Sequence, residues 1–224
     1  INSIKVTAVD LLQSGESDYE GLNNIDIKLS HKNSNELLEI FSNYLFFIAN
    51  KNNSLTLIEK TVSGFYVFDI ESNPDIKHDF LYGFLKVNNL FTKKENLIYE
   101  PILNLKNEKQ ESYKQIIRLL FSNKEWSVLH YGETERIAII NIAKKLNFSF
   151  EEIDLLKSRF IDLHTLIRNS WILPIKNYSL KSVSNWLGFK WNQKNVNGSK
   201  ALYWWIQYQI TNNEIFLRKI IQYN

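Results

Sequence analysis

The chain has 224 residues, of which 44% are hydrophobic and 23% are charged. These values are typical of globular proteins and exclude collagen-like, coiled-coil and wholly disordered chains. The net charge of +3 is too small to identify a partner, and the lack of cysteine excludes disulfides, thiolate metal sites and cysteine nucleophiles.

Membrane and targeting segments are not expected. No apolar run reaches the roughly 18 residues that a membrane-spanning helix needs, and no targeting segment is recognisable at the start of the chain. We therefore predict a cytoplasmic protein with no membrane partner. The chain begins with Ile1 and contains no methionine, so we expect it to be a fragment of a longer polypeptide.

Residues 1–60 are predicted to be a separate N-terminal segment, whose role the sequence leaves open. Alternating apolar residues predict a short strand at residues 4–9. Apolar residues at helical spacing between residues 37 and 46 predict a helix, which Asn35 is expected to cap. A polar tract at residues 50–54 then predicts a loop before the second region.

Residues 61–224 have a more regular pattern and are the second predicted domain. Aromatic and β-branched runs predict strands, at residues 64–70, 80–87, 97–103 and 126–131. Helical spacing predicts helices, at residues 110–121, 133–146, 151–160, 163–170, 180–187, 199–210 and 214–222. In the helix at 133–146, Ile137, Ile140 and Leu146 are expected to face inward. This order predicts an α/β fold, a mixed sheet flanked by helices with a helix-rich C-terminal half.

Two acidic residues follow the apolar part of the first strand in this domain. Because side chains alternate along a strand, Asp69 and Glu71 share one face. Their Cα atoms would lie roughly 6–7 Å apart, and oxygen ligands suit Mg²⁺ or Mn²⁺ rather than zinc. Taken alone, the triplet favours a simpler interpretation, in which both acids leave the strand at a turn at residues 72–74 and face water.

The next strand–helix junction favours the metal site. Glu135 falls in the first turn of the helix at 133–146. There it either stabilises the helix dipole or points back over the sheet toward the acidic pair. His130 is a weaker candidate ligand, because a single histidine at a strand end is more often simply hydrogen-bonded. Asp162 is expected to cap the next helix.

These stretches together resemble DEDD-type exonucleases with a ribonuclease-H-like fold, and more closely the predicted ribonuclease-H-like domain of YprB-like proteins. Residues 68–74 and 80–83 are similar to the first motif, and residues 130–135 to the second, in which Glu replaces the usual Asp. Tyr223 is similar to the Tyr that opens the third motif, whose Asp follows four residues later, beyond Asn224. The resemblance covers residues 61–224 and departs at Thr134, where an aromatic residue is common.

The resemblance implies metal-dependent hydrolysis of phosphodiester bonds in DNA or RNA, as a 3′–5′ exonuclease with two Mg²⁺ or Mn²⁺ ions. In this family, Asp69 would bridge both ions, Glu71 and Glu135 would each bind one, and Tyr223 would orient the attacking water. A RecB-type nuclease domain often precedes such a domain, so that domain or a helicase domain is an expected partner in the same polypeptide. With the chain truncated before the third acidic motif, we expect this fragment to be weakly active or inactive.

A basic, acid-free stretch predicts contacts with a nucleic acid. Between Leu163 and Asn213 the sequence has no Asp or Glu, but it has six cations and five of the six tryptophans. Basic residues interleaved with aromatic residues suit single strands, whose bases stack on rings. The alternative is that the rings are core residues, above all Trp204 and Trp205 on a predicted helix. The residues predicted as contacts are Lys176, Lys181, Lys190 and Trp191.

Three functions therefore remain open from the sequence. The favoured one is a DEDD-type exonuclease. Its main rival is a non-catalytic nucleic-acid-binding module on the same ribonuclease-H-like fold. A structural or interaction domain with no nucleic-acid role is the third.

Overall fold

The computed structural model describes residues 60, 63–88, 97–105, 109–171, 173, 175–189 and 197–224. The strand and helix predicted within residues 1–60 lie outside the described residues, as do Lys190 and Trp191. The predicted division into two domains at residue 60 therefore stays a prediction.

Five strands form one mixed sheet in the order β3-β2-β1-β4-β5. Strand β1 (Phe65–Asn73) is antiparallel to β2 (His78–Val87), which is antiparallel to β3 (Ile98–Leu103). Strand β4 (Ser127–His130) is parallel to β1, and β5 (Phe160–Asp162) is parallel to β4. The strand predicted at residues 64–70 is confirmed, and β1 occupies the middle of the sheet.

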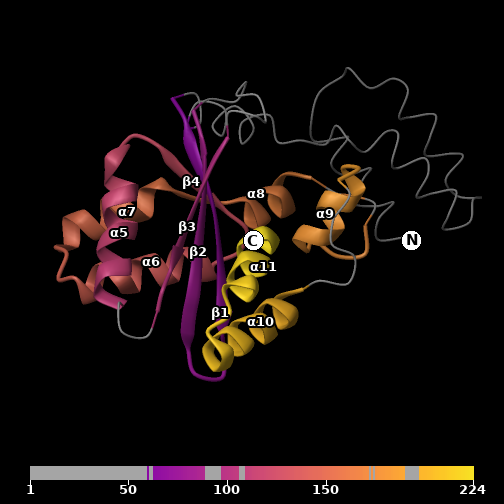
Figure 1. The fold of residues 1–224 in the computed structure, drawn as a ribbon. Helices are drawn as coiled ribbons and strands as arrows, with labels where there is room; N and C mark the ends of the chain where they lie inside the picture. The colour runs from indigo at the N-terminus through magenta and orange to yellow at the C-terminus, as the bar shows by residue number, and fades with distance from the viewer. Residues whose placement is uncertain are drawn as a thin grey trace, which may run out of the picture.

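Helices cover both faces of this sheet (Figure 1). On one face lie α5 (Lys109–Ser122), α6 (Thr134–Lys145) and α7 (Phe150–Arg159). On the other lie α8 (Leu163–Ser170), α9 (Leu180–Trp186), α10 (Gly198–Thr211) and α11 (Glu214–Tyr223). The predicted mixed α/β architecture with a helix-rich C-terminal half is therefore confirmed.

Apolar clusters lie on both faces of the sheet. Tyr66, Phe68 and Ile70 of β1 pack with apolar residues of α5, α6 and α7. On the opposite face, residues of β2 pack against α10 and α11, and the Phe80 and Trp205 rings stack with centroids 4.7 Å apart. Trp204 and Trp205 are thus core residues, so the alternative interpretation of these two rings is the correct one.

The structure differs from the sequence prediction at two points on the α6–α7 side. Strand β5 was missed, because its three residues are too short for a recognisable alternation and directly follow a helix. The prediction that Ile137 faces inward is also wrong, since its side chain is 52% exposed. Helix α6 instead buries Ile139 together with the predicted Ile140.

Among the helices that the structure describes, none has both the length and the apolar character needed to cross a membrane.

Candidate active site

The acidic pair of β1 lies on the face that α10 and α11 cover. Strand β1 does not turn at residues 72–74, as one interpretation of the sequence expected, but continues to Asn73 with a bulge after Glu71. Asp69 is exposed, whereas Glu71 is only 8% exposed. The simpler interpretation, in which both acids face water, is therefore wrong for Glu71.

Burial perturbs both carboxyl groups, and repulsion from Asp69 adds to the effect on Glu71. Desolvation, followed by the negative charge of Asp69, raises the pKa of Glu71 to about 8. Asp69 is exposed by surface area, but it lines a hollow of about 290 Å³ with protein around it. That partial desolvation raises the pKa of Asp69, and a hydrogen bond from the backbone of Ile70 opposes the shift. A cation between the two groups would remove the repulsion, because an opposite charge favours the ionised carboxylate.

The end of α11 brings Tyr223 and Asn224 to this pair. The Asn224 side-chain amide donates hydrogen bonds to Asp69 Oδ2 at 3.1 Å and to Glu71 Oε1 at 3.5 Å. Burial raises the pKa of Tyr223 to about 12, and the charges of Glu71 and Asp69 add to the shift. Tyr223 is therefore within electrostatic reach of both acids, and its hydroxyl stays protonated at neutral pH.

Glu135, at the start of α6, is a further acidic residue within reach of the charge of Asp69. It lies in the first helical turn, as predicted, and is only 7% exposed. Burial, with a contribution from the charge of Asp69, raises its pKa to about 7. Its Oε2 is buried and has no hydrogen-bond partner among the described residues. An unpartnered carboxylate oxygen at this depth is unusual, and it is available to a cation.

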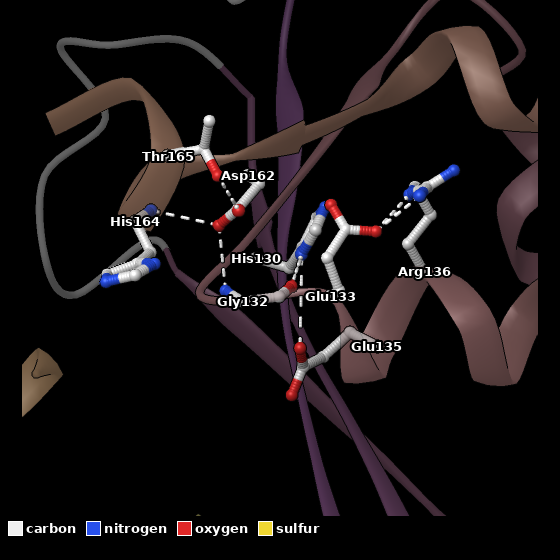
Figure 2. A network of polar contacts seen from close by, with 8 residues as sticks. All are labelled: His130, Gly132, Glu133, Glu135, Arg136, Asp162, His164 and Thr165. Carbon is white, nitrogen blue, oxygen red and sulfur yellow. Dashed lines mark hydrogen bonds and ion pairs between the residues drawn. The ribbon is translucent and has the colours of Figure 1, made fainter. Parts of the chain in front are cut away.

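A polar network holds the β4–α6 junction behind Glu135 (Figure 2). The His130 Nδ1 atom is hydrogen-bonded to the carbonyl oxygen of Gly132 and lies 3.9 Å from Glu135 Oε2. Desolvation lowers the pKa of His130, which keeps the ring neutral. Gly132 has a φ of 106°, in the left-handed region that favours glycine. The interpretation of His130 as a hydrogen-bonded histidine agrees with these contacts.

Asp162 belongs to this junction and caps α8. Its Oδ1 accepts hydrogen bonds from the backbone amides of Gly132 at 2.8 Å and His164 at 2.9 Å (Figure 2). Burial acts to raise the pKa of Asp162, but the bonds from Thr165, Gly132 and His164 outweigh it and hold the pKa below its usual range. The prediction that Asp162 is an N-cap is confirmed, and the residue ties the start of α8 to the loop that precedes α6.

Asp69, Glu71 and Glu135 are the carboxylates that could hold a divalent cation together. Among the residues that the structure describes, no three His, Asp or Glu side chains are grouped as a ready metal site. Asp69 and Glu71 are coupled to each other by charge, and Glu135 is coupled to Asp69. The oxygen-only donor set of these three carboxylates fits a hard divalent cation such as Mg²⁺ or Mn²⁺.

The predicted nucleic-acid contacts are only partly described. Lys176 and Lys181 are exposed, next to and within α9. Lys190 and Trp191 lie outside the described residues, so their role as contacts stays a prediction. Trp186 is half-buried on α9.

Two residues beside the acidic pair were not found from the sequence. Tyr99 of β3 donates a hydrogen bond from its hydroxyl to Asn224 Oδ1 at 2.7 Å. Gly83 of β2 lies opposite Asp69 in the strand register. A glycine inside a strand often marks a close approach of other groups, so Gly83 carried a signal, whereas nothing in the sequence around Tyr99 distinguishes it from a structural tyrosine.

The chain matches a known protein family. A family model described as the RNase_H superfamily matches residues 66–224. No curated protein and no solved structure matches the chain. The matched range begins in β1 and includes all four residues predicted to be catalytic.

Proposed function

The chain belongs to the RNase H superfamily, and from this membership we propose that it is a metal-dependent phosphodiesterase that degrades DNA or RNA as a 3′–5′ exonuclease. Superfamily membership itself indicates nuclease-type activity or nucleic-acid binding. One observation supports the finer proposal. The charge of Asp69 adds to the raised pKa values of Glu71 of β1, Glu135 of α6 and Tyr223 of α11, although these residues come from three elements far apart in the sequence.

Asp69, Glu71 and Glu135 are the residues that would hold the divalent ions. Their carboxylate oxygens are the ligands that Mg²⁺ and Mn²⁺ prefer, and the buried Oε2 of Glu135 has no hydrogen-bond partner among the described residues. When bound, such ions polarise the phosphodiester and lower the pKa of a coordinated water.

The remaining chemistry belongs to the protein's own side chains. Glu71, with a pKa of about 8, holds its proton at neutral pH until a positive charge lies beside it. Tyr223 keeps its proton, because burial and the two acids raise its pKa to about 12. The tyrosine is thus suited to donate a hydrogen bond that orients either the attacking water or a phosphate oxygen.

A second candidate is a non-catalytic module that binds nucleic acid on the same fold. The observation that favours it is that no three potential ligands are grouped as a ready metal site among the described residues. Lys176 and Lys181, both exposed in the acid-free stretch, would serve binding in either case. A neighbouring RecB-type nuclease or helicase domain would then supply the catalysis.

The test is hydrolysis of labelled oligonucleotides by the intact protein with Mn²⁺, Mg²⁺ or EDTA. Single-stranded DNA and RNA are each used with a free or a phosphorothioate-blocked 3′ end. We expect stepwise shortening from free 3′ ends with Mn²⁺ and none with EDTA. Asp69→Asn should abolish it. Glu133→Gln should not, because Glu133 is an exposed acid that pairs with Arg136.

The other outcomes separate the candidates. Binding without hydrolysis under every condition would favour the non-catalytic module. Cleavage that is unchanged in Asp69→Asn would place the chemistry elsewhere. Failure to bind or cleave any of these substrates at low salt would contradict both candidates.

A further inference from the structure

A chain of hydrogen bonds connects the edge strand β3 to the acidic pair of β1. The Tyr99 hydroxyl donates to Asn224 Oδ1 at 2.7 Å, and Asn224 Nδ2 donates to Asp69 Oδ2 at 3.1 Å and more weakly to Glu71 Oε1 at 3.5 Å. We refer to Tyr99 and Asn224 with these bonds as the Tyr99–Asn224 relay. A single amide therefore contacts both carboxylates and restrains one relative to the other.

The relay also fixes which way the Asn224 amide points. Its oxygen accepts from Tyr99, so its NH₂ group faces the carboxylates. The flipped amide would give up the hydrogen bond that its oxygen accepts from Tyr99 and the one that its NH₂ group donates to Asp69 Oδ2. Burial of Tyr99, with added effects of Asp69 and Glu71, raises its pKa, so the hydroxyl keeps the proton that it donates.

Gly83 leaves the space through which the relay passes. It pairs with Asp69 on one side and with Pro101 on the other. A Cβ atom at this position would lie 1.8 Å from Asn224 Oδ1 and 2.7 Å from the Tyr99 hydroxyl oxygen. Both distances are far below van der Waals contact, so any side chain here would displace the relay. The requirement for glycine is therefore steric.

We infer that Tyr99 and Asn224 are positioning residues that orient the carboxylates of Asp69 and Glu71 for a divalent cation, with Gly83 keeping the relay open. This inference rests on the proposed function. Asn224 occupies one oxygen of each carboxylate and leaves the other oxygen of each to a cation. Groups that hold metal ligands by hydrogen bonds typically change metal affinity by about 10–100-fold when removed.

Tyr99→Phe is the most direct test, because it removes one hydroxyl and keeps the ring. Calorimetric titration of the intact protein with Mn²⁺ should give an affinity about 10-fold below the wild type, with an unchanged far-ultraviolet circular dichroism spectrum. Tyr66→Phe is the matched control. It also removes a hydroxyl that donates a hydrogen bond, to the Leu119 carbonyl, but on the opposite face of the sheet. Its Mn²⁺ affinity should equal that of the wild type.

Gly83→Ala tests the same relay without removing a polar group. It should weaken Mn²⁺ binding by a similar factor, whereas Gly198→Ala should not, because an added Cβ there meets no atom within 4 Å. Combining Tyr99→Phe with Asn224→Ala should weaken binding no further than Asn224→Ala alone, since both changes break one path. If the losses of Mn²⁺ affinity add in the double variant, the two residues act independently and the inference of a relay is wrong.

Two failures are distinguishable. If the wild type binds Mn²⁺, Asp69→Asn does not, and Tyr99→Phe binds like the wild type, then the positioning role is wrong and the proposed metal site stands. If the wild-type protein binds no Mn²⁺ at all, the proposed metal site is wrong and this inference fails with it.

Discussion

The two faces of the central strand β1 serve different purposes, although their residues alternate along one chain segment. Toward α5–α7 the strand presents Tyr66, Phe68 and Ile70, which are buried in the larger core. Toward α10 and α11 it presents the exposed Asp69 and the buried Glu71. Because the side-chain period of a strand is two residues, adjacent substitutions in β1 should separate stability from chemistry.

The largest expected effect is a loss of stability from a substitution on the core face of β1, toward α5–α7. Phe68 is 2% exposed and stacks on Phe84 with ring centroids 4.3 Å apart. Phe68→Ala should lower the free energy of unfolding by about 3–5 kcal/mol, because it leaves a cavity in a packed interior. The adjacent Val67→Ala should cost below about 1 kcal/mol, because Val67 is already 37% exposed. Urea denaturation measures both changes, and equal losses would contradict the separation of the two faces.

A smaller effect, of opposite sign, is expected on the acidic face without metal. The pKa of Glu71 rises from 4.5 to about 8 on folding, so the folded state retains a proton that the unfolded state loses. The stability of the metal-free protein should therefore fall as pH rises from about 4.5 to about 8. Glu71→Gln should remove part of this fall, a gain of about 1–3 kcal/mol at pH 8.

Thermal unfolding in EDTA at pH 5 and pH 8 measures that gain. Glu133→Gln is the control, because Glu133 is exposed and its removal should leave the pH dependence unchanged. Added Mn²⁺ should stabilise the wild type but not Glu71→Gln. If Glu71→Gln loses as much stability as the wild type between pH 5 and pH 8, Glu71 is not the group that makes the stability depend on pH.

The smallest expected effect is a change in nucleic-acid affinity and in its dependence on salt, on the face of the sheet that holds the acidic pair. Lys181 is in α9, which lies on the same face of the sheet as the acidic pair. Lys176 lies just before α9 in the sequence. If about three lysines contact phosphates of a single strand, log K should fall against log salt with a slope of roughly −2. Replacing Lys176, Lys181 and Lys190 together by Gln should flatten that slope and weaken binding several-fold.

The matched control changes three lysines on the opposite side of the sheet. Lys124, Lys144 and Lys145 are exposed on or next to α5 and α6. Replacing them by Gln alters the net charge by the same amount but should leave the slope unchanged. Equal effects of the two triple variants in a fluorescence anisotropy titration would mean that overall charge, rather than the acid-free stretch, determines binding.

Much of the fold could be predicted from the sequence, because its elements have strong periodic patterns. Strands β1 and β2 and the helices from α5 to α11 lie within a few residues of their predicted bounds. The register of α6 could not be predicted, since several of its apolar positions satisfy helical spacing equally well. Only contact with the sheet decides that Ile139 rather than Ile137 is buried.

Only those residues of the candidate site that belong to a local sequence pattern could be predicted. Asp69 and Glu71 were identifiable because alternation in one strand brings them to one face. The sequence did not indicate how deeply Glu71 is buried, which depends on packing by other elements. Tyr99 could not be predicted, because its partner Asn224 is 125 residues away and no local pattern connects them.

The bond between Asn224 and Asp69 has a consequence for the order of folding, because it joins residues 155 positions apart. Antiparallel β1, β2 and β3 are close in sequence and need only short loop closures, which are the fastest steps. The docking of α11, in which Ile220 is the fully buried residue, closes a much longer loop and so should come late. Detachment of α11 alone would then separate Asn224 from the acidic pair while the sheet persists, as in local unfolding of other proteins. The acidic pair therefore reaches its final geometry only when the contact between Asn224 and Asp69 has formed.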